Sequence, residues 1–205
     1  MSGTIRLIVG LGNPGEKYIG TRHNAGQEFV RQLAVQLKFS ELKPDLKLFS
    51  KASRISDSDK DLHLIIPQTF MNDSGRSVAA YSRFFKINPK EILVVHDDLD
   101  IAAGVARFKI GGGHGGHNGL RDIICSLGKN TDFYRLRIGI GHPGSADKVT
   151  SYVLSRPSDQ DKQIINLAIN EAVSLIPILL KGNITLAMSK LHGKVFSENN
   201  CSGNS

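Results

Sequence analysis

Four clusters of glycine, asparagine, histidine and aspartate interrupt the sequence where short apolar runs end, at residues 10–24, 67–72, 96–100 and 111–118. A histidine near its ordinary pKa can take a proton from water at neutral pH, and a carboxylate bonded to its ring fixes the tautomer that accepts the proton. Asparagine carries both donors and acceptors, so it can orient water, bind an amide or stabilise an oxyanion. These residue types predict a general-base site, sufficient to hydrolyse an activated bond such as an ester.

The first cluster matches the dinucleotide-binding pattern G-x-G-x-x-G between Gly10 and Gly15, so that kind of site must be weighed. In dinucleotide-binding proteins the helix begins within the glycines, and an acidic residue about twenty positions later holds a ribose. Here Pro14 and Tyr18 indicate a longer loop, and residues 33–40 contain neither Asp nor Glu. The context therefore argues against a dinucleotide site.

Histidines in the third and fourth clusters suggest a metal site. His96, His114 and His117 could bind a metal ion, but a glycine-rich loop sets no fixed spacing between ligands, so the pattern is not specific. Nucleophilic catalysis is not favoured, because the sequence has no G-x-S-x-G motif and Cys125 has no neighbouring cation. We expect neither a metal nor a cofactor, and a metal-dependent hydrolase remains an alternative.

The charge balance favours a polyanionic partner. With 26 Lys and Arg against 19 Asp and Glu, the net charge of +7 suits nucleic acid, because cations gain affinity by releasing counterions from phosphates. A basic surface that serves only solubility is the alternative. Residues 101–150 hold seven basic and three acidic side chains. Any anion-binding face should draw on Arg107, Lys109, Arg121, Arg135 and Arg137.

Other features indicate the compartment. Cys125 and Cys201 are too few for a disulfide framework, and no signal peptide opens the chain. The longest apolar stretch, residues 175–180, is interrupted by Pro177 and does not approach the length of a membrane span. We therefore expect a cytoplasmic protein without a membrane segment. We also expect a monomer.

Apolar spacing predicts the elements that must position the four clusters. Short apolar or alternating runs predict strands, and apolar residues at intervals of three and four predict helices. Ser158, with Asp161 three residues later, has the spacing of a capping box. The expected strands are residues 5–9, 47–55, 62–66, 92–95, 105–110 and 135–140. The expected helices are residues 29–37, 74–85, 118–127, 158–181 and 183–192.

This alternation predicts an α/β fold in which helices cover both faces of a mixed, largely parallel sheet. Without an internal repeat or linker, residues 1–193 should form a single three-layer α/β/α catalytic domain, and the polar residues 194–205 should be disordered. Pro177 predicts a kink in the long helix. In open sheets of this kind, binding sites gather beyond the carboxyl ends of the strands, which is where the four clusters fall.

The same clusters closely resemble the motifs of the bacterial peptidyl-tRNA hydrolase family. The matching segments follow the family order over residues 6–145, and the likeness is weak beyond residue 150. The resemblance implies a metal-independent esterase that cleaves the bond between a peptidyl or N-blocked aminoacyl group and the 3′ end of tRNA. The matching segments are residues 9–15 with Tyr18, then 21–26, 67–72, 74–75, 96–100, 111–120 and 135–144.

The resemblance also implies a role for each matching residue. His23 is the general base that activates water, and Asp97 is its carboxylate partner. Asn72 and Asn118 are the candidates that hold the water and polarise the carbonyl. Asn13 distinguishes a blocked from a free amino group. The substrate-binding residues are Asn13, Tyr18, Phe70, Asn72 and Asn118, and the cations that bind tRNA phosphates are Arg107, Lys109 and Arg137.

Structural roles compete with several of these assignments. His23 could bond only to backbone where a helix begins, Asn13 and Asn72 could tie turns, and Asn118 could be no more than a helix cap. We expect the histidines of the glycine-rich loop to support that loop rather than to act in catalysis. A catalytically silent RNA-binding protein with the same fold is the alternative function.

Overall fold

The computed structural model describes residues 4–56 and 61–197, and a seven-stranded sheet runs through its centre. The strands are β1 Leu7–Gly10, β2 Lys43–Asp45, β3 Ser50–Ser56, β4 Asp61–Pro67, β5 Ile92–Asp98, β6 Ala106–Ile110 and β7 Tyr134–Gly139. Their order across the sheet is β2-β3-β4-β1-β5-β7-β6. The central strands β4, β1, β5 and β7 are parallel, whereas β2, β3 and β6 run antiparallel to their neighbours. The sheet is thus mixed, as predicted.

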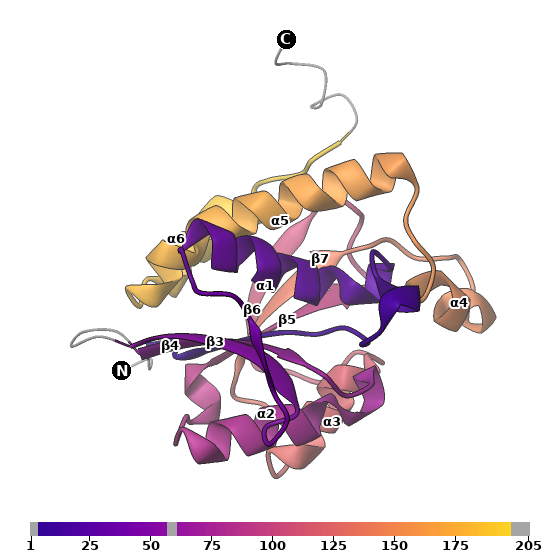
Figure 1. Cartoon of the computed structure of the whole chain (residues 1–205). Coiled ribbons are helices and arrows are strands. Elements are labelled where there is room, and N and C mark those ends of the chain that lie inside the picture. The colour runs from indigo at the N-terminus through magenta and orange to yellow at the C-terminus, as the bar shows by residue number, and fades with distance from the viewer. Residues whose placement is uncertain (1–3, 57–60, 198–205) are drawn as a thin grey trace.

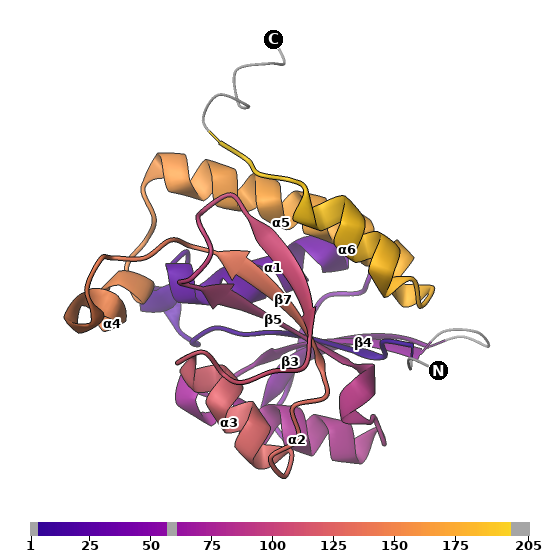
Figure 2. The same ribbon diagram turned by 180° about the vertical axis from the view of Figure 1, so that it is seen from behind.

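Helices cover both faces of this sheet. Figure 1 shows α1, α5 and α6 on one face and α2 and α3 on the other, and Figure 2 shows the same three layers from behind. Because both faces are covered, the central strands are buried nearly throughout. The predicted α/β/α class is confirmed. The helices are α1 Ala25–Gln36, α2 Ser74–Phe84, α3 Asn118–Ser126, α4 Val149–Val153, α5 Asp159–Leu180 and α6 Ile184–His192.

Two glycines let the start of α1 pack directly on the sheet backbone. A Cβ atom at Gly10 would lie 2.3 Å from the Gly26 carbonyl oxygen, and one at Gly26 would lie 2.2 Å from the Val95 carbonyl oxygen. Real Cβ atoms do not approach so closely, so these positions require glycine. The close approach brings the segment before α1 to the carboxyl ends of β1 and β5.

Four elements differ from the prediction. Residues 46–49 form a turn, so the strand expected from residue 47 begins at Ser50. The missed strand β2 is polar and largely exposed, and it owes its geometry to pairing with β3. β5 continues three residues beyond its expected end, to Asp98, because these residues pair with β7. The five-residue α4 was not predicted.

α5 begins as its sequence predicts, since the Ser158 hydroxyl accepts a hydrogen bond from the Asp161 N–H at 3.1 Å. The helix continues past Pro177 to Leu180. By length and composition it is the one helix in the described ranges that could cross a membrane, whereas we expected no stretch to approach this. Eight of its residues, including Ile169, are buried against the other core residues, which is the pattern of a core helix.

The chain after α6 returns to the domain. The Phe196 N–H donates to the Gly104 carbonyl at 2.9 Å, and the Phe196 ring packs against the core. The start of the segment that we expected to be a disordered tail is therefore bound to the domain. The rest of that segment, residues 198–205, lies outside the described residues.

Candidate active site

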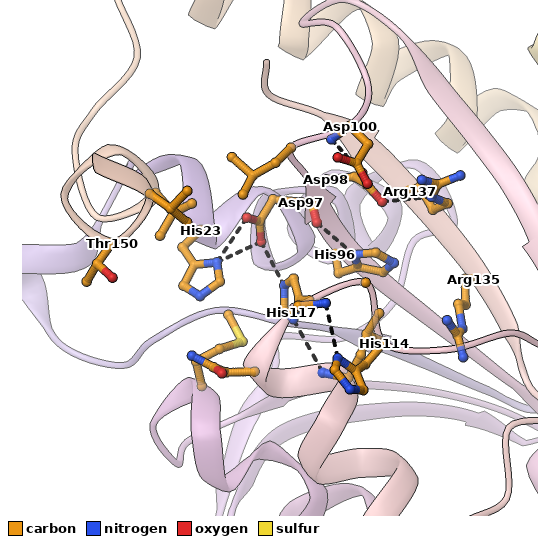
Figure 3. Close-up of a pocket in the computed structure, with 18 of the residues that line it drawn as sticks. His23, His96, Asp97, Asp98, Asp100, His114, His117, Arg135, Arg137 and Thr150 are labelled. Atoms are coloured by element: carbon orange, nitrogen blue, oxygen red, sulfur yellow. Dashed lines mark hydrogen bonds and ion pairs between the residues drawn. The ribbon is translucent and has the colours of Figure 1, made fainter. Parts of the chain in front are cut away.

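His23 and Asp97 meet at the carboxyl ends of β1 and β5. His23 lies in a 3₁₀ turn, Arg22–Asn24, directly before α1, and Asp97 is near the end of β5. The His23 Nδ1 atom is 2.8 Å from Asp97 Oδ1 and 3.0 Å from Oδ2. Figure 3 draws these contacts as dashed lines. Because the carboxylate only accepts, Nδ1 carries the proton. The other ring nitrogen points away from Asp97 and keeps its lone pair.

The environment of this pair makes His23 a stronger base. Burial alone would lower the pKa of His23, but the charge of Asp97 and the hydrogen bond to it raise that pKa above its ordinary value. Burial would raise the pKa of Asp97, yet the charges and hydrogen bonds of His23 and His117 lower it. Asp97 therefore stays ionised at neutral pH, and its charge stabilises a His23 imidazolium as it forms.

Asp97 has a second imidazole partner, His117, which we expected only to support the glycine-rich loop. The His117 Nε2 atom lies 3.0 Å from Asp97 Oδ1, and its Nδ1 accepts the Leu120 N–H at 3.3 Å. Since Nδ1 accepts, the proton lies on Nε2 and is donated to the carboxylate. His117 is thus the N-cap of α3 and joins that helix to the His23–Asp97 pair. Asn118 is the first residue of the helix rather than its cap.

His96 lies behind this cluster. Its Nδ1 is 2.7 Å from the Asp97 carbonyl oxygen, and its ring packs against that of His117 with centroids 5.0 Å apart. Burial, assisted by the nearby His117, lowers the pKa of His96 to about 3, so this ring is neutral. His96 therefore supports the backbone at Asp97 without adding charge to the site.

Asn13 lies in the loop after β1, and a backbone group fixes the orientation of its side chain. Its Oδ1 accepts the Met71 N–H at 2.8 Å, so the NH2 end of the amide faces other contacts. Asn24 binds the Asn13 backbone from both sides, through the Asn13 N–H at 2.8 Å and the Asn13 carbonyl at 3.0 Å. Asn13 therefore does tie turns together, as the alternative held, and it also presents a fixed donor.

A pocket of about 770 Å³ brings most of the predicted residues together. Tyr18 and Phe70 do not line it. Their rings pack edge to face with centroids 6.4 Å apart, and Phe70 is 57 % exposed. Arg107 does not line it either. The predicted residues in the pocket wall are Asn13, His23, Asn72, Asp97, Lys109, Asn118, Arg135 and Arg137.

The cations near the pocket divide into two kinds. Lys109 is exposed, and Arg137 is partly exposed with its Nε donating to Asp98 Oδ2 at 2.7 Å. Arg107 pairs with Arg137 across the β6–β7 ladder, so both side chains lie on one face of the sheet. Arg135, which we expected on the same anion-binding face, is 2 % exposed and donates to the carbonyls of the glycine-rich loop.

Within the described ranges, His23, Asp97 and His117 are the one group that could hold a metal ion, with ligand atoms within 4.8 Å of one another. The two imidazole nitrogens that would bind a metal are directed at the carboxylate at hydrogen-bond distance. The metal set weighed from the sequence, with His96 and His114, is not brought together among these residues.

One wall of the pocket was missed entirely. It comes from α4 and the residue after it, and includes Val149, Thr150, Val153 and Leu154. α4 contacts the turn that carries His23, where Arg22 donates to Ser155 Oγ at 2.8 Å. The apolar spacing of Val149 and Val153 was the available signal, but one helical turn is too short to predict from periodicity.

Comparisons with known proteins agree with this geometry. A family model described as peptidyl-tRNA hydrolase matches residues 7–199. The peptidyl-tRNA hydrolase of Mannheimia succiniciproducens is 53% identical over 189 residues, covering 92% of this chain and 97% of the relative, and that of Shewanella amazonensis is 55% identical over 188 residues, covering 92% and 96%. The crystal structure of peptidyl-tRNA hydrolase from Acinetobacter baumannii is similar with a TM-score of 0.89 and 46% identity, over 93% of this chain and 96% of that one.

Proposed function

The chain belongs to the peptidyl-tRNA hydrolase family, and we propose that His23 is the general base of its reaction. The protein is an enzyme that hydrolyses the ester bond of peptidyl-tRNA. The observation that carries the role of His23 is its Nδ1 contact with Asp97 at 2.8 Å. That contact leaves the second ring nitrogen unprotonated beside a pocket that contains polar amides.

The proposed reaction begins with a water molecule bound to the free nitrogen of His23. As the water oxygen attacks the ester carbonyl carbon, its proton passes to His23, and Asp97 stabilises the imidazolium. The carbonyl oxygen becomes an oxyanion. When this intermediate collapses, the bond to the ribose oxygen breaks, and that oxygen takes the proton from His23. The products are tRNA with a free terminal hydroxyl and a peptide with a free carboxylic acid, which loses the remaining proton of the water to solvent at neutral pH.

Asn72 and Asn118 are the proposed donors that hold the water and stabilise the oxyanion. Both line the pocket and both are exposed, so their amides can reach a substrate. Asn118 is the first residue of α3. The N-terminus of a helix carries a partial positive charge, which favours a developing oxyanion. His117 fixes the start of that helix relative to Asp97.

Asn13, Tyr18 and Phe70 are the proposed contacts to the substrate groups on either side of the scissile ester bond. The fixed NH2 group of Asn13 can donate to the acyl carbonyl of a blocked amino group, whereas a free α-ammonium would face another donor. The exposed Phe70 ring, held edge to face by Tyr18, offers a surface on which a base of single-stranded RNA can stack.

Arg107, Lys109 and Arg137 are the proposed contacts to tRNA phosphates. The β6–β7 register places all three side chains on one face of the sheet, and Lys109 and Arg137 continue from the pocket wall. Phosphate contacts of this kind should make binding depend strongly on salt. The proposal extends to a monomeric, cytoplasmic enzyme whose catalytic domain is residues 1–193. One chain supplies the base, its carboxylate and the amide donors, and no step needs a metal.

The test uses N-acetyl-aminoacyl-tRNA with purified protein and a chelator. The wild type should release tRNA at the same rate with the chelator as without it. His23→Ala should bind the substrate with little turnover. No release by the wild type, with or without metal, would indicate the silent RNA-binding protein. Loss of activity with the chelator would indicate a metal-dependent reaction at His23, Asp97 and His117. Full activity of His23→Ala would overturn the role of the base.

A further inference from the structure

Two arginines that lie two residues apart on β7 have opposite environments. Arg135 and Arg137 point to the same face of the sheet, because side chains alternate along a strand. Arg137 is partly exposed and forms an ion pair with Asp98. Arg135 is 2 % exposed, and no carboxylate of the described residues forms an ion pair with it. Both arginines touch the pocket, but only Arg137 has an appreciable exposed surface. A tRNA phosphate can therefore reach Arg137, whereas the glycine-rich loop covers nearly all of Arg135.

The cover over Arg135 is the glycine-rich loop between β6 and α3. The Nη1 atom of Arg135 donates to the Gly113 carbonyl and its Nη2 atom donates to the Gly112 carbonyl. The planar guanidinium therefore binds two successive peptide groups. The guanidinium also lies over the Phe133 ring, with its central carbon Cζ 4.7 Å from the ring centroid. Burial, followed by the charge of Arg137, lowers the pKa of Arg135 to about 10. The guanidinium is still charged at neutral pH.

These two hydrogen bonds hold a stretch of loop that has few others. The Gly111 N–H bonds to the Phe133 carbonyl, and farther along the Gly116 N–H bonds only within the loop, to His114. Between these points, in the described chain, Arg135 supplies the hydrogen bonds that tie the loop to the sheet. Figure 3 shows Arg135 beside the loop that carries His114 and His117.

The loop ends at the residues that complete the catalytic cluster. His117, four residues after Gly113, donates to Asp97, and Asn118 follows it at the start of α3. Movement of residues 112–116 would therefore change the position of His117 relative to Asp97.

We propose that Arg135 is a positioning residue of the reaction, which holds the glycine-rich loop so that His117 reaches Asp97 and Asn118 faces the pocket. Arg135 acts through these residues and does not bind tRNA phosphates. The inference rests on the proposed roles of His23 and Asp97. It assigns the two arginines of β7 to different steps, Arg135 to turnover and Arg137 to binding.

The test compares Arg135→Lys with Arg137→Lys and Arg137→Gln. A lysine keeps the charge, but its single ammonium cannot reproduce the two parallel hydrogen bonds of the guanidinium. The values of kcat and KM for N-acetyl-aminoacyl-tRNA are measured at several salt concentrations. We expect Arg135→Lys to lower kcat by about 10- to 100-fold, as a displacement near 1 Å can do, with the salt dependence of KM unchanged. Arg137→Gln should raise KM. It should also reduce the salt dependence of KM by the amount expected for the loss of about one phosphate contact.

A structural readout separates this role from a general loss of stability. In the wild type and in Arg137→Lys, NMR of labelled histidines should show the His117 Nε2 proton protected by its bond to Asp97. In Arg135→Lys that protection should be lost while the fold is retained. Arg135→Gln, which keeps one amide donor, serves as a second variant with the same expected loss of kcat.

Unchanged kcat in both Arg135 variants would overturn the inference, as would a raised KM with a reduced salt dependence in Arg135→Lys. Retained protection of His117 in these variants would overturn it too. If the wild type does not hydrolyse the substrate, or if His23→Ala retains full activity, the proposed function fails. An active wild type with fully active Arg135 variants would refute the role of Arg135 alone.

Discussion

The side-chain oxygen of Asn13 accepts a hydrogen bond from the backbone N–H of Met71 at 2.8 Å, which determines which end of the Asn13 amide can meet a substrate. A backbone N–H is only a donor, so the atom facing it must be the oxygen. No residue that the structure describes forms a hydrogen bond with the NH2 group of Asn13. The site thus presents a fixed donor where the blocked amino group is expected to lie.

Asn13→Asp tests this arrangement directly. The aspartate keeps an oxygen for the Met71 N–H but replaces the donor with a negative charge. Hydrolysis of N-acetyl-aminoacyl-tRNA should fall by about 10- to 100-fold, which corresponds to one lost hydrogen bond and an unpaired partner. Because a carboxylate attracts an α-ammonium, the ratio of kcat/KM for blocked over free aminoacyl-tRNA should narrow. Asn13→Ala should lower the same ratio less, and an unchanged ratio in both variants would reject the role.

Replacement of Asp97 should move the pH dependence of the reaction. The pKa of His23 is raised above its ordinary value, so the rate of the wild type should fall with decreasing pH through that raised pKa. In Asp97→Asn the charge is lost while burial remains, so the pKa of His23 should drop and the acid limb should move to lower pH. The plateau rate should also fall, by up to about 10⁴-fold, where the new amide favours the His23 tautomer that cannot take a proton from the water. Asp98→Asn, at the neighbouring carboxylate, should leave the acid limb in place. An unmoved limb in Asp97→Asn would contradict the pairing.

Phe70→Ala should weaken substrate binding without changing the chemical step. Stacking of a base on an exposed aromatic ring contributes about 1–3 kcal/mol, so KM should rise by about 5- to 150-fold while kcat changes little. Phe84 is also an exposed ring, at 69 %, but it is the last residue of α2, whereas Phe70 directly precedes the pocket residues Met71 and Asn72. Phe84→Ala is therefore a matched control that should leave KM unchanged. Equal KM values for both variants and the wild type would show that Phe70 does not bind the tRNA.

Gly26→Ala should damage both stability and turnover. The added Cβ would lie 2.2 Å from the Val95 carbonyl oxygen, so α1 must move away from β5 and carry His23 away from Asp97. We expect a loss of about 1–3 kcal/mol in the free energy of unfolding, as for other overpacked sites, together with a lower kcat. Gly193→Ala is the control, because a Cβ there meets nothing within 4 Å. Denaturant unfolding and steady-state kinetics measure both effects, and a Gly26→Ala protein with wild-type stability would contradict the close approach.

Much of the fold could be predicted because its central strands are continuous apolar runs between glycine-rich or polar ends. β2 could not, since its residues are polar and become a strand only by pairing with β3. The clusters at the strand ends indicated where His23, Asp97 and Asn13 would gather. The strand alternation that placed Arg135 and Arg137 on one face could not show which of them the loop would cover. The bond from His117 to Asp97 depends on how that loop folds, so the sequence indicated only a supporting role.

The most direct test of the central claim is chemical rescue of His23→Ala. The single-turnover rate of ester hydrolysis is measured for the wild type and for His23→Ala, with and without added imidazole. Since general-base catalysis contributes about 10²–10⁴-fold, His23→Ala should lose a factor of that size. Imidazole should restore part of the rate, because the pocket of about 770 Å³ has room for the missing ring, and more basic imidazoles should restore more. A His23→Ala enzyme that hydrolyses N-acetyl-aminoacyl-tRNA at the wild-type rate without imidazole would contradict the account.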